Sequence, residues 1–157
     1  MKEIVMINEN LKLSGQLNIV LKDKAGNVKD SRDLKNLVVN AGLAYIASRM
    51  KDTTKGAMSH MALGSGTTNA AASQTDLVTI LGSREALDST AIAGTNSEKV
   101  VYEASFEAGD ATGAVTEAGI FNAATGGDML CRTKFNVVNK AADDTMSVTW
   151  TITLSAS

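Results

Sequence analysis

The stretch TMSVTWTITL, residues 145–154, alternates apolar and polar side chains without a break. An alternation with a period of two places one set of side chains on each face of a β-strand. The polar set is mostly threonine, a β-branched residue that favours strands. The stretch therefore predicts a half-buried strand. Its core-facing row would be Met146, Val148, Trp150, Ile152 and Leu154.

The same alternation recurs in three other parts of the chain, in residues 11–21, 99–107 and 129–135. In the first of these, the leucine and isoleucine side chains share one side and Gly15 is predicted to form a bulge. Segments with glycine and polar residues separate the predicted strands, namely residues 22–27, 107–113 and 122–128. Short strands with regular glycine turns favour a β-sandwich or a β-barrel.

One segment has a helical pattern instead. In NAGLAYIASRM, residues 40–50, Leu43, Ile46, Ala47 and Met50 recur at helical spacing. Asn40 is a good N-terminal cap, and the last turn carries basic side chains. We predict one helix of about three turns near residues 41–50. Residues 65–97 are weakly periodic, and we expect long loops there with a short strand near Ala86 to Ala91.

Composition limits the class of protein. The chain has 157 residues, 44% of them hydrophobic and 20% charged, which fits one globular domain. Its formal net charge of −2 gives no electrostatic reason to bind nucleic acid or anionic lipid. With one cysteine, Cys131, no intrachain disulfide can form. The first residues lack the pattern of a signal peptide, and no apolar run reaches the ~18 residues of a membrane span. We expect a soluble protein made in a cytoplasm.

The glycine loop GSGTT, residues 64–68, raises the question of a nucleotide site. A phosphate-binding loop needs a lysine and a hydroxyl directly after its last glycine, and the loop here has no lysine. The three-glycine dinucleotide pattern is also incomplete. The loop is predicted to be a structural bend. In this interpretation Gly64 and Gly66 adopt positive φ and lead the chain to the other sheet.

The other candidate site residues also favour structural roles. His60 and Cys131 are too few for a zinc site, and His60 is expected to be a partly exposed strand residue. Asp143 and Asp144 lie in a turn-like stretch where solvated acids are expected. Glu117 shares a strand face with apolar residues, so we expect it to point inward and to pair with Arg132 across the 122–128 hairpin. Acid–base chemistry by Glu117 remains the alternative. The sequence thus predicts no catalytic residue, no cofactor and no metal.

Residues 1–10, MKEIVMINEN, precede the first clear strand, so the predicted domain spans residues 11–157. Yet Ile4, Val5, Met6 and Ile7 form an apolar run, whereas a solvated terminus is usually polar. This segment is either an edge strand of its own sheet or an arm that packs on a neighbouring subunit. We take these four residues as the candidate interface.

Four segments together resemble a recurring set in structural proteins of tailed-bacteriophage virions, most closely a capsid decoration (cement) protein. They are LVVNAGLAYIASRM (37–50), HMALGSGTT (60–68), TEAGIFNAATGGDMLCRTKF (116–135) and DDTMSVTWTITL (143–154). The likeness covers residues 11–154. A proline often follows the GTT loop in that set, and Asn69-Ala70 stands there in this chain.

The resemblance implies a jelly-roll-like antiparallel β-sandwich that forms a homodimer or homotrimer. It further implies a non-enzymatic protein, made in the host bacterial cytoplasm, that binds the major capsid protein on the capsid exterior and stabilises the shell by bridging subunits. No nucleic-acid or membrane partner is expected. The alternative is a tail or baseplate-associated module that recognises a host glycan or protein.

Overall fold

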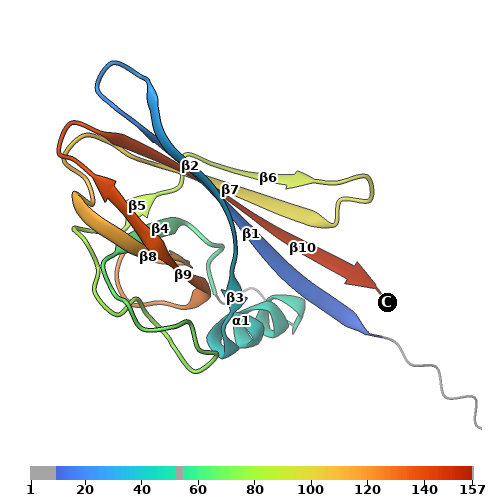
Figure 1. Cartoon of the computed structure of the whole chain (residues 1–157). Helices are drawn as coiled ribbons and strands as arrows, with labels where there is room; N and C mark the ends of the chain where they lie inside the picture. Colours follow the sequence, from blue (N-terminus) through green and yellow to red (C-terminus); the bar gives the residue numbers. More distant parts are fainter. Residues whose placement is uncertain (1–9, 52–54, 157) are drawn as a thin grey trace, which may run out of the picture.

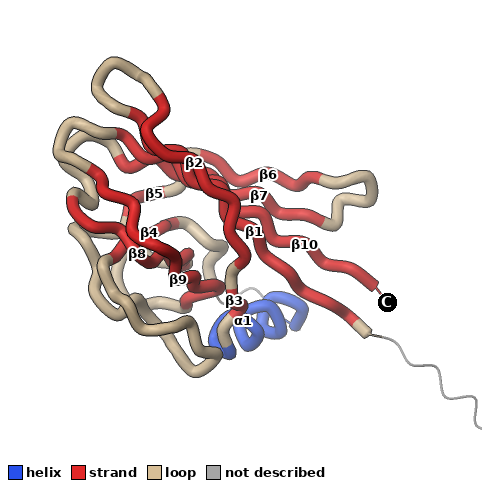
Figure 2. The backbone as a smooth tube through the Cα atoms, in the orientation of Figure 1, coloured by secondary structure: helices blue, strands red, loops and turns tan. Residues whose placement is uncertain are grey.

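A computed structural model describes residues 10–51 and 55–156, which form a two-layer β-sandwich with one α-helix (Figures 1 and 2). The elements in chain order are β1 (Leu11–Lys22), β2 (Val28–Lys35), β3 (Leu37–Val38), α1 (Asn40–Lys51), β4 (His60–Gly64), β5 (Glu85–Ala86), β6 (Ser89–Ala93), β7 (Lys99–Phe106), β8 (Gly113–Phe121), β9 (Met129–Lys140) and β10 (Thr145–Ala156). The predicted all-β sandwich with one short helix is confirmed. Within the described residues, no helix is long and apolar enough to cross a membrane.

The strands form two five-stranded antiparallel sheets. Sheet A has the order β2-β1-β10-β7-β6, and sheet B has the order β3-β9-β8-β4-β5. β1 pairs with β10 over its whole length, and β3 pairs with β9. The early and late strands therefore lie side by side in both sheets, which is the jelly-roll-like feature of the sandwich. The hairpins β6–β7 and β8–β9 each stay within one sheet.

The predicted bulge at Gly15 is wrong. Gly15 pairs with Ile152 in unbroken register, and the irregularity of β1 lies instead between Leu21 and Lys22. Gly15 is needed for space, because a Cβ there would collide with the side chain of Asn36. The oxygen of that amide accepts a hydrogen bond from Trp150 Nε1 at 2.8 Å.

The core lies between the sheets and is built by the alternating rows that the sequence predicted. Trp150 is fully buried and belongs to a core cluster with apolar side chains of β1, β7, β8 and β9. The predicted core-facing row of β10 is buried from Met146 to Ile152, and Leu154 is partly exposed. The final residues of β10 pair with the start of β1. This part of sheet A extends beyond sheet B, so the end of the row is not covered (Figure 1).

The predicted helix is present. Of its apolar residues at helical spacing, Ile46 packs against the core, whereas Leu43 and Met50 are 51% and 81% exposed. The buried residues of α1 are Gly42 and Tyr45. Gly42 lies so close to β9 that a Cβ there would collide with the Leu130 carbonyl. The approach of the helix to the sheet thus requires a residue without a side chain, and this requirement turns the apolar stripe partly to solvent.

The position of Trp150 leads to a test of the core. Removing a large aromatic side chain from a core typically costs ~3–5 kcal/mol, and whole domains are stable by only ~5–15 kcal/mol. We expect Trp150→Ala to be largely unfolded or insoluble, because it also leaves Asn36 without its indole donor. Thr151→Ala, on the opposite face of the same strand, is expected to melt within a few degrees of the parent. Thermal melting followed by circular dichroism measures both, and a parental melting temperature for Trp150→Ala would contradict the assignment.

Candidate functional site

A fully buried ion pair joins the two central strands of sheet B. Glu117 on β8 and Arg132 on β9 are both completely inaccessible to solvent, and Arg132 Nη2 lies 2.7 Å from Glu117 Oε2. Arg132 Nε donates a second hydrogen bond to the same oxygen at 3.0 Å. The sequence prediction that Glu117 points inward and pairs with Arg132 across the 122–128 hairpin is therefore confirmed.

The same pair holds the long loop of residues 65–84. Glu117 accepts hydrogen bonds from the backbone N–H groups of Gly66, Val78 and Thr79, at 2.8 to 3.1 Å. Arg132 donates to the carbonyl of Thr68 and to the side-chain oxygen of Gln74. We call Glu117, Arg132 and these loop contacts the clamp. The clamp gives the loop a defined path, although the loop has almost no secondary structure.

The two glycines of the loop act differently from the prediction. Neither Gly64 nor Gly66 has a positive φ, and the chain does not cross to the other sheet after them, because β5 pairs with β4 in sheet B. A Cβ at either glycine would collide with the Glu117 side chain. The glycines are therefore needed for the close approach of the backbone to a carboxylate, and no signal of spacing in the sequence reveals that requirement.

The charge of Glu117 is stabilised by its contacts. Burial disfavours the carboxylate, but the hydrogen bonds from Thr79, Val78, Arg132 and Gly66 outweigh burial and lower the pKa of Glu117 below its usual value. An ionised carboxylate that is sealed from solvent and surrounded by donors cannot reach a substrate. This geometry favours the structural interpretation of Glu117 over acid–base chemistry.

The other predicted site residues lie apart. His60, at the start of β4, is half-buried as predicted, and its Nδ1 lies 2.8 Å from Ser59 Oγ. Cys131 is fully buried, and burial raises the pKa of its thiol, which keeps the thiol protonated. Across the described ranges 10–51 and 55–156, no three His, Cys, Asp or Glu side chains are grouped to hold a metal ion.

Asp144 corrects the expectation of solvated turn acids. It is only 3% exposed, and its carboxylate binds Lys29 Nζ at 2.6 Å. Lys140 is also buried, and its ammonium group donates to the carbonyls of Glu107 and Asp144. This cluster ties the β9–β10 turn to the β1–β2 hairpin. The neighbouring Asp143 is exposed, as predicted.

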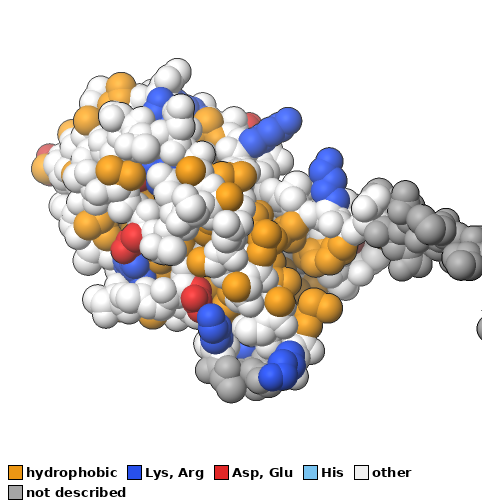
Figure 3. All heavy atoms as spheres, turned by 90° about the horizontal axis from the view of Figure 1, so that it is seen from below, with side chains coloured by type: hydrophobic (Ala, Val, Ile, Leu, Met, Phe, Trp, Pro, Cys, Tyr) orange, Lys and Arg blue, Asp and Glu red, His pale blue; other side chains and the backbone are white. Residues whose placement is uncertain are grey.

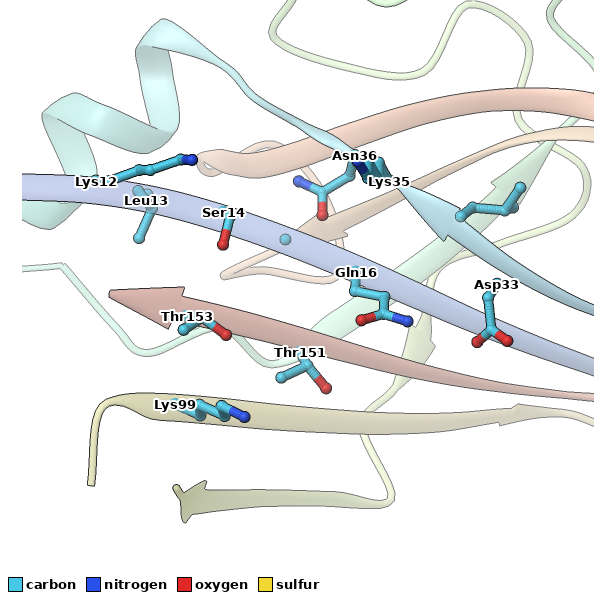
Figure 4. Close-up of a pocket in the computed structure, with 12 residues that line it drawn as sticks. Lys12, Leu13, Ser14, Gln16, Asp33, Lys35, Asn36, Lys99, Thr151 and Thr153 are labelled. Atoms are coloured by element: carbon cyan, nitrogen blue, oxygen red, sulfur yellow. The ribbon is translucent and has the colours of Figure 1, made fainter. Parts of the chain in front are cut away.

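A polar groove of about 740 Å³ lies over sheet A near the point where β2 leaves β1. Figure 4 shows its side chains coming from β1, β2, β7 and β10. The polar members are Lys12, Ser14, Gln16, Asp33, Lys35, Asn36, Lys99, Thr151 and Thr153. Within the described part of the chain, none of the three lysines forms an ion pair. The groove therefore offers hydroxyl and amide groups together with three ammonium groups and the carboxylate of Asp33.

An apolar surface lies at the end of sheet A that extends beyond sheet B. The inner-face rows of β1, β10, β7 and β6 continue there, and they include Leu11, Leu13, Leu154, Val100 and Ile92. Leu11 is 69% exposed and Ile92 is 65% exposed. We call these five residues the apolar shelf. In Figure 3, hydrophobic side chains gather between the body of the molecule and this projecting end.

The four residues of the candidate interface, Ile4, Val5, Met6 and Ile7, lie outside the described residues. The apolar shelf was not predicted from the sequence. The alternation of β1 and β10 gives the face on which a side chain lies, but it does not give the distance over which sheet B covers that face. That distance depends on how the two sheets overlap, and no signal in the sequence reveals it.

Comparisons with known proteins find no relative of this chain. A scan against protein-family models finds no match, and searches of curated proteins and of solved structures find none either.

The clamp predicts a dependence of stability on pH. Because the folded pKa of Glu117 lies below its usual value of 4.5, the ionised pair contributes fully above pH 4.5. This contribution is lost as the pH falls through the lower folded pKa. Glu117→Gln leaves Arg132 buried without its charge partner, and we expect a loss of about 3–5 kcal/mol at pH 7.

The measurement is urea unfolding of both proteins from pH 7 to pH 3. The difference in unfolding free energy between parent and Glu117→Gln should shrink toward acid pH. Glu103→Gln, on the exposed face of β7, is the matched control and should stay within about 0.5 kcal/mol of the parent. A constant difference over the whole range would mean that the ionisation of Glu117 does not stabilise the fold.

Proposed function

We propose that the chain is a non-enzymatic structural protein of a phage virion that binds the outer capsid surface and stabilises the shell by bridging subunits. The observation that carries this proposal is the apolar shelf. Contiguous exposed apolar surface on a soluble domain usually marks a site of protein–protein interaction. The shelf includes the start of β1, and in the sequence three polar residues separate Leu11 from the apolar run of residues 4–7. Both features support an attachment surface at one end of the sandwich.

The hydrogen bonds of the buried charged residues also support a structural role. The carboxylate that the sequence singled out for chemistry, Glu117, is buried and is bonded on both oxygens. The buried Lys140 and Asp144 are likewise engaged in holding turns. These groups stabilise the position of loops, and a protein that stabilises a shell needs a rigid body of this kind.

The segments that carry the resemblance to virion proteins supply strands of both sheets. Residues 60–68 and 116–135 supply β4, the β8–β9 hairpin and both members of the clamp. Residues 143–154 supply most of β10. The resemblance thus rests on the residues that build the sandwich, which supports a shared architectural role. The proposed partners are the major capsid protein and further copies of the chain, and many modest contacts on a shell reinforce one another.

The polar groove favours the alternative, a tail or baseplate-associated module that recognises a host glycan or protein. Its hydroxyl, amide and ammonium groups would suit a polar ligand with negative charge. Its described lining contains no aromatic side chain, which sugar-binding surfaces commonly use for stacking. For this reason we keep capsid attachment as the leading proposal.

Charge substitutions on the two surfaces separate these functions. Leu11→Asp changes the most exposed residue of the shelf, so folding should be retained. We expect this protein to lose at least tenfold in occupancy on capsids of the phage that encodes it. Lys12→Ala combined with Lys35→Ala, in the groove, is the matched control and should keep parental occupancy. Capsid pelleting and immunogold labelling measure the result. Tail labelling, or loss only in the groove variant, would favour the recognition module.

Deletion of residues 1–9 tests the candidate interface of Ile4, Val5, Met6 and Ile7. We expect a soluble β-rich domain with a parental melting temperature and weakened self-association or capsid attachment, because an apolar arm that packs on a neighbour is removed. Melting, oligomer mass and shell occupancy are the three measurements. Collapse of the fold would identify the segment as an internal strand, and parental values for both occupancy and mass would refute the arm.

A further inference from the structure

The four edge strands of the two sheets are β2, β6, β3 and β5, and they differ in how well they are protected. β3 and β5 have only two residues each. β2 carries five charged side chains, and its Arg32 donates to the carbonyls of Asn136 and Val137 on β9. Short length and charge are the usual means by which proteins block unwanted pairing at a sheet edge. Three of the four edges are therefore blocked.

β6 lacks all of these protections. It is a five-residue strand, STAIA, with no charged residue, no proline and no register shift against β7. Its residues Ser89 to Ile92 are exposed. Such an edge presents unpaired backbone N–H and C=O groups that a further strand can bind.

We propose that β6 pairs antiparallel with β6 of a second copy of this chain, so that two five-stranded sheets A join into one continuous sheet. The two-fold axis passes through Ala91, because this register lets the two five-residue strands overlap completely. Ala91 then faces Ala91 of the second copy, Thr90 faces Ile92, and Ser89 faces Ala93. An interface of this kind is isologous and closes at two copies.

The sequence of β6 suits this self-pairing. No like charges meet in any facing pair, and small residues occupy the outer face. On the inner face, Thr90 lies beside Tyr102 and Ile92 lies beside Val100 in the existing β6–β7 register. The 65% exposed Ile92 would gain Thr90 of the second copy as its missing neighbour. The inner faces of the two sheets A would then form one continuous face, on which the two apolar shelves extend toward opposite ends.

Charges flank the proposed interface in a complementary pattern. In the β6–β7 register, Ser89 pairs with Glu103 and Ala93 pairs with Lys99. Because Ser89 faces Ala93 of the second copy, Glu103 of one copy shares a cross-strand row with Lys99 of the other. The two charges are three strand spacings apart, about 14 Å between backbones. Exposed charges at this separation are largely screened, so these rows are compatible with the proposed register but do not select it.

Cysteine cross-linking tests the register directly. The native Cys131 is fully buried, so an introduced exposed cysteine is the thiol that can form a disulfide between two copies. Facing residues of antiparallel strands have Cα atoms about 4.5–5.5 Å apart, within the range for a disulfide. We expect Ala91→Cys in the full chain to form a reducible dimer when diamide oxidises the two thiols. Ala93→Cys is the matched control, because its two copies would lie about 13 Å apart along the strands and should remain uncross-linked.

The solution mass is the second measurement. The parent protein should show twice the 16.4 kDa of one chain by light scattering. Ala91→Lys and Ala91→Glu should each raise the dissociation constant at least tenfold, because like charges then meet on the axis. A mixture of the two variants should restore the dimer. Ser31→Lys, at the edge strand β2, should leave the mass unchanged.

A monomeric parent, a trimer, equal cross-linking of Ala91→Cys and Ala93→Cys, or no recovery in the mixture would each overturn the proposal. The inference is independent of the proposed virion role, because it concerns the mass of the isolated protein. Failure of capsid attachment would leave a dimeric protein in solution, so the two failures are distinguishable.

Discussion

The buried pair of Glu117 and Arg132 is the constraint on which sheet B and its long loop depend. Two fully buried charges are costly unless hydrogen bonds satisfy them. Here the loop of residues 65–84 supplies those bonds from its backbone, and the pair in turn fixes the loop. Loops of about this length are uncommon without secondary structure of their own. The charge pair and the loop therefore stabilise each other, and neither would be favourable alone.

Much of the sandwich could be predicted because alternation is a local property. The rows around Trp150 and Tyr102, the glycine turns and the pairing of Glu117 with Arg132 follow from residues that are near in sequence or joined by one hairpin. The errors arose where distant chain segments meet. Gly42 allows α1 to approach β9, Gly64 and Gly66 make room for a carboxylate, and Asp144 is buried by Lys29 from the other end of the chain. No local pattern encodes those contacts.

The candidate surfaces were harder to predict than the core for the same reason. The apolar shelf exists because the paired ends of β1 and β10 extend beyond sheet B (Figure 1). The sequence of β1 gives no indication of the residue at which sheet B stops packing over its inner face. The free edge at β6 is likewise a property of the sheet order. Its absence of charge is visible in the sequence, but an uncharged strand becomes an open edge only when the fold leaves it outermost.

The pairing of β1 with β10 has a consequence for the time at which the protein can fold. Residues 11–22 are made early, yet their partner spans residues 145–156, so sheet A cannot close until the ribosome has synthesised almost all of this sequence. Pairings between residues so far apart form slowly, and the waiting apolar strand is exposed to aggregation in the meantime. Until β10 has been made, sheet A can consist only of the two hairpins β1–β2 and β6–β7, which β10 joins.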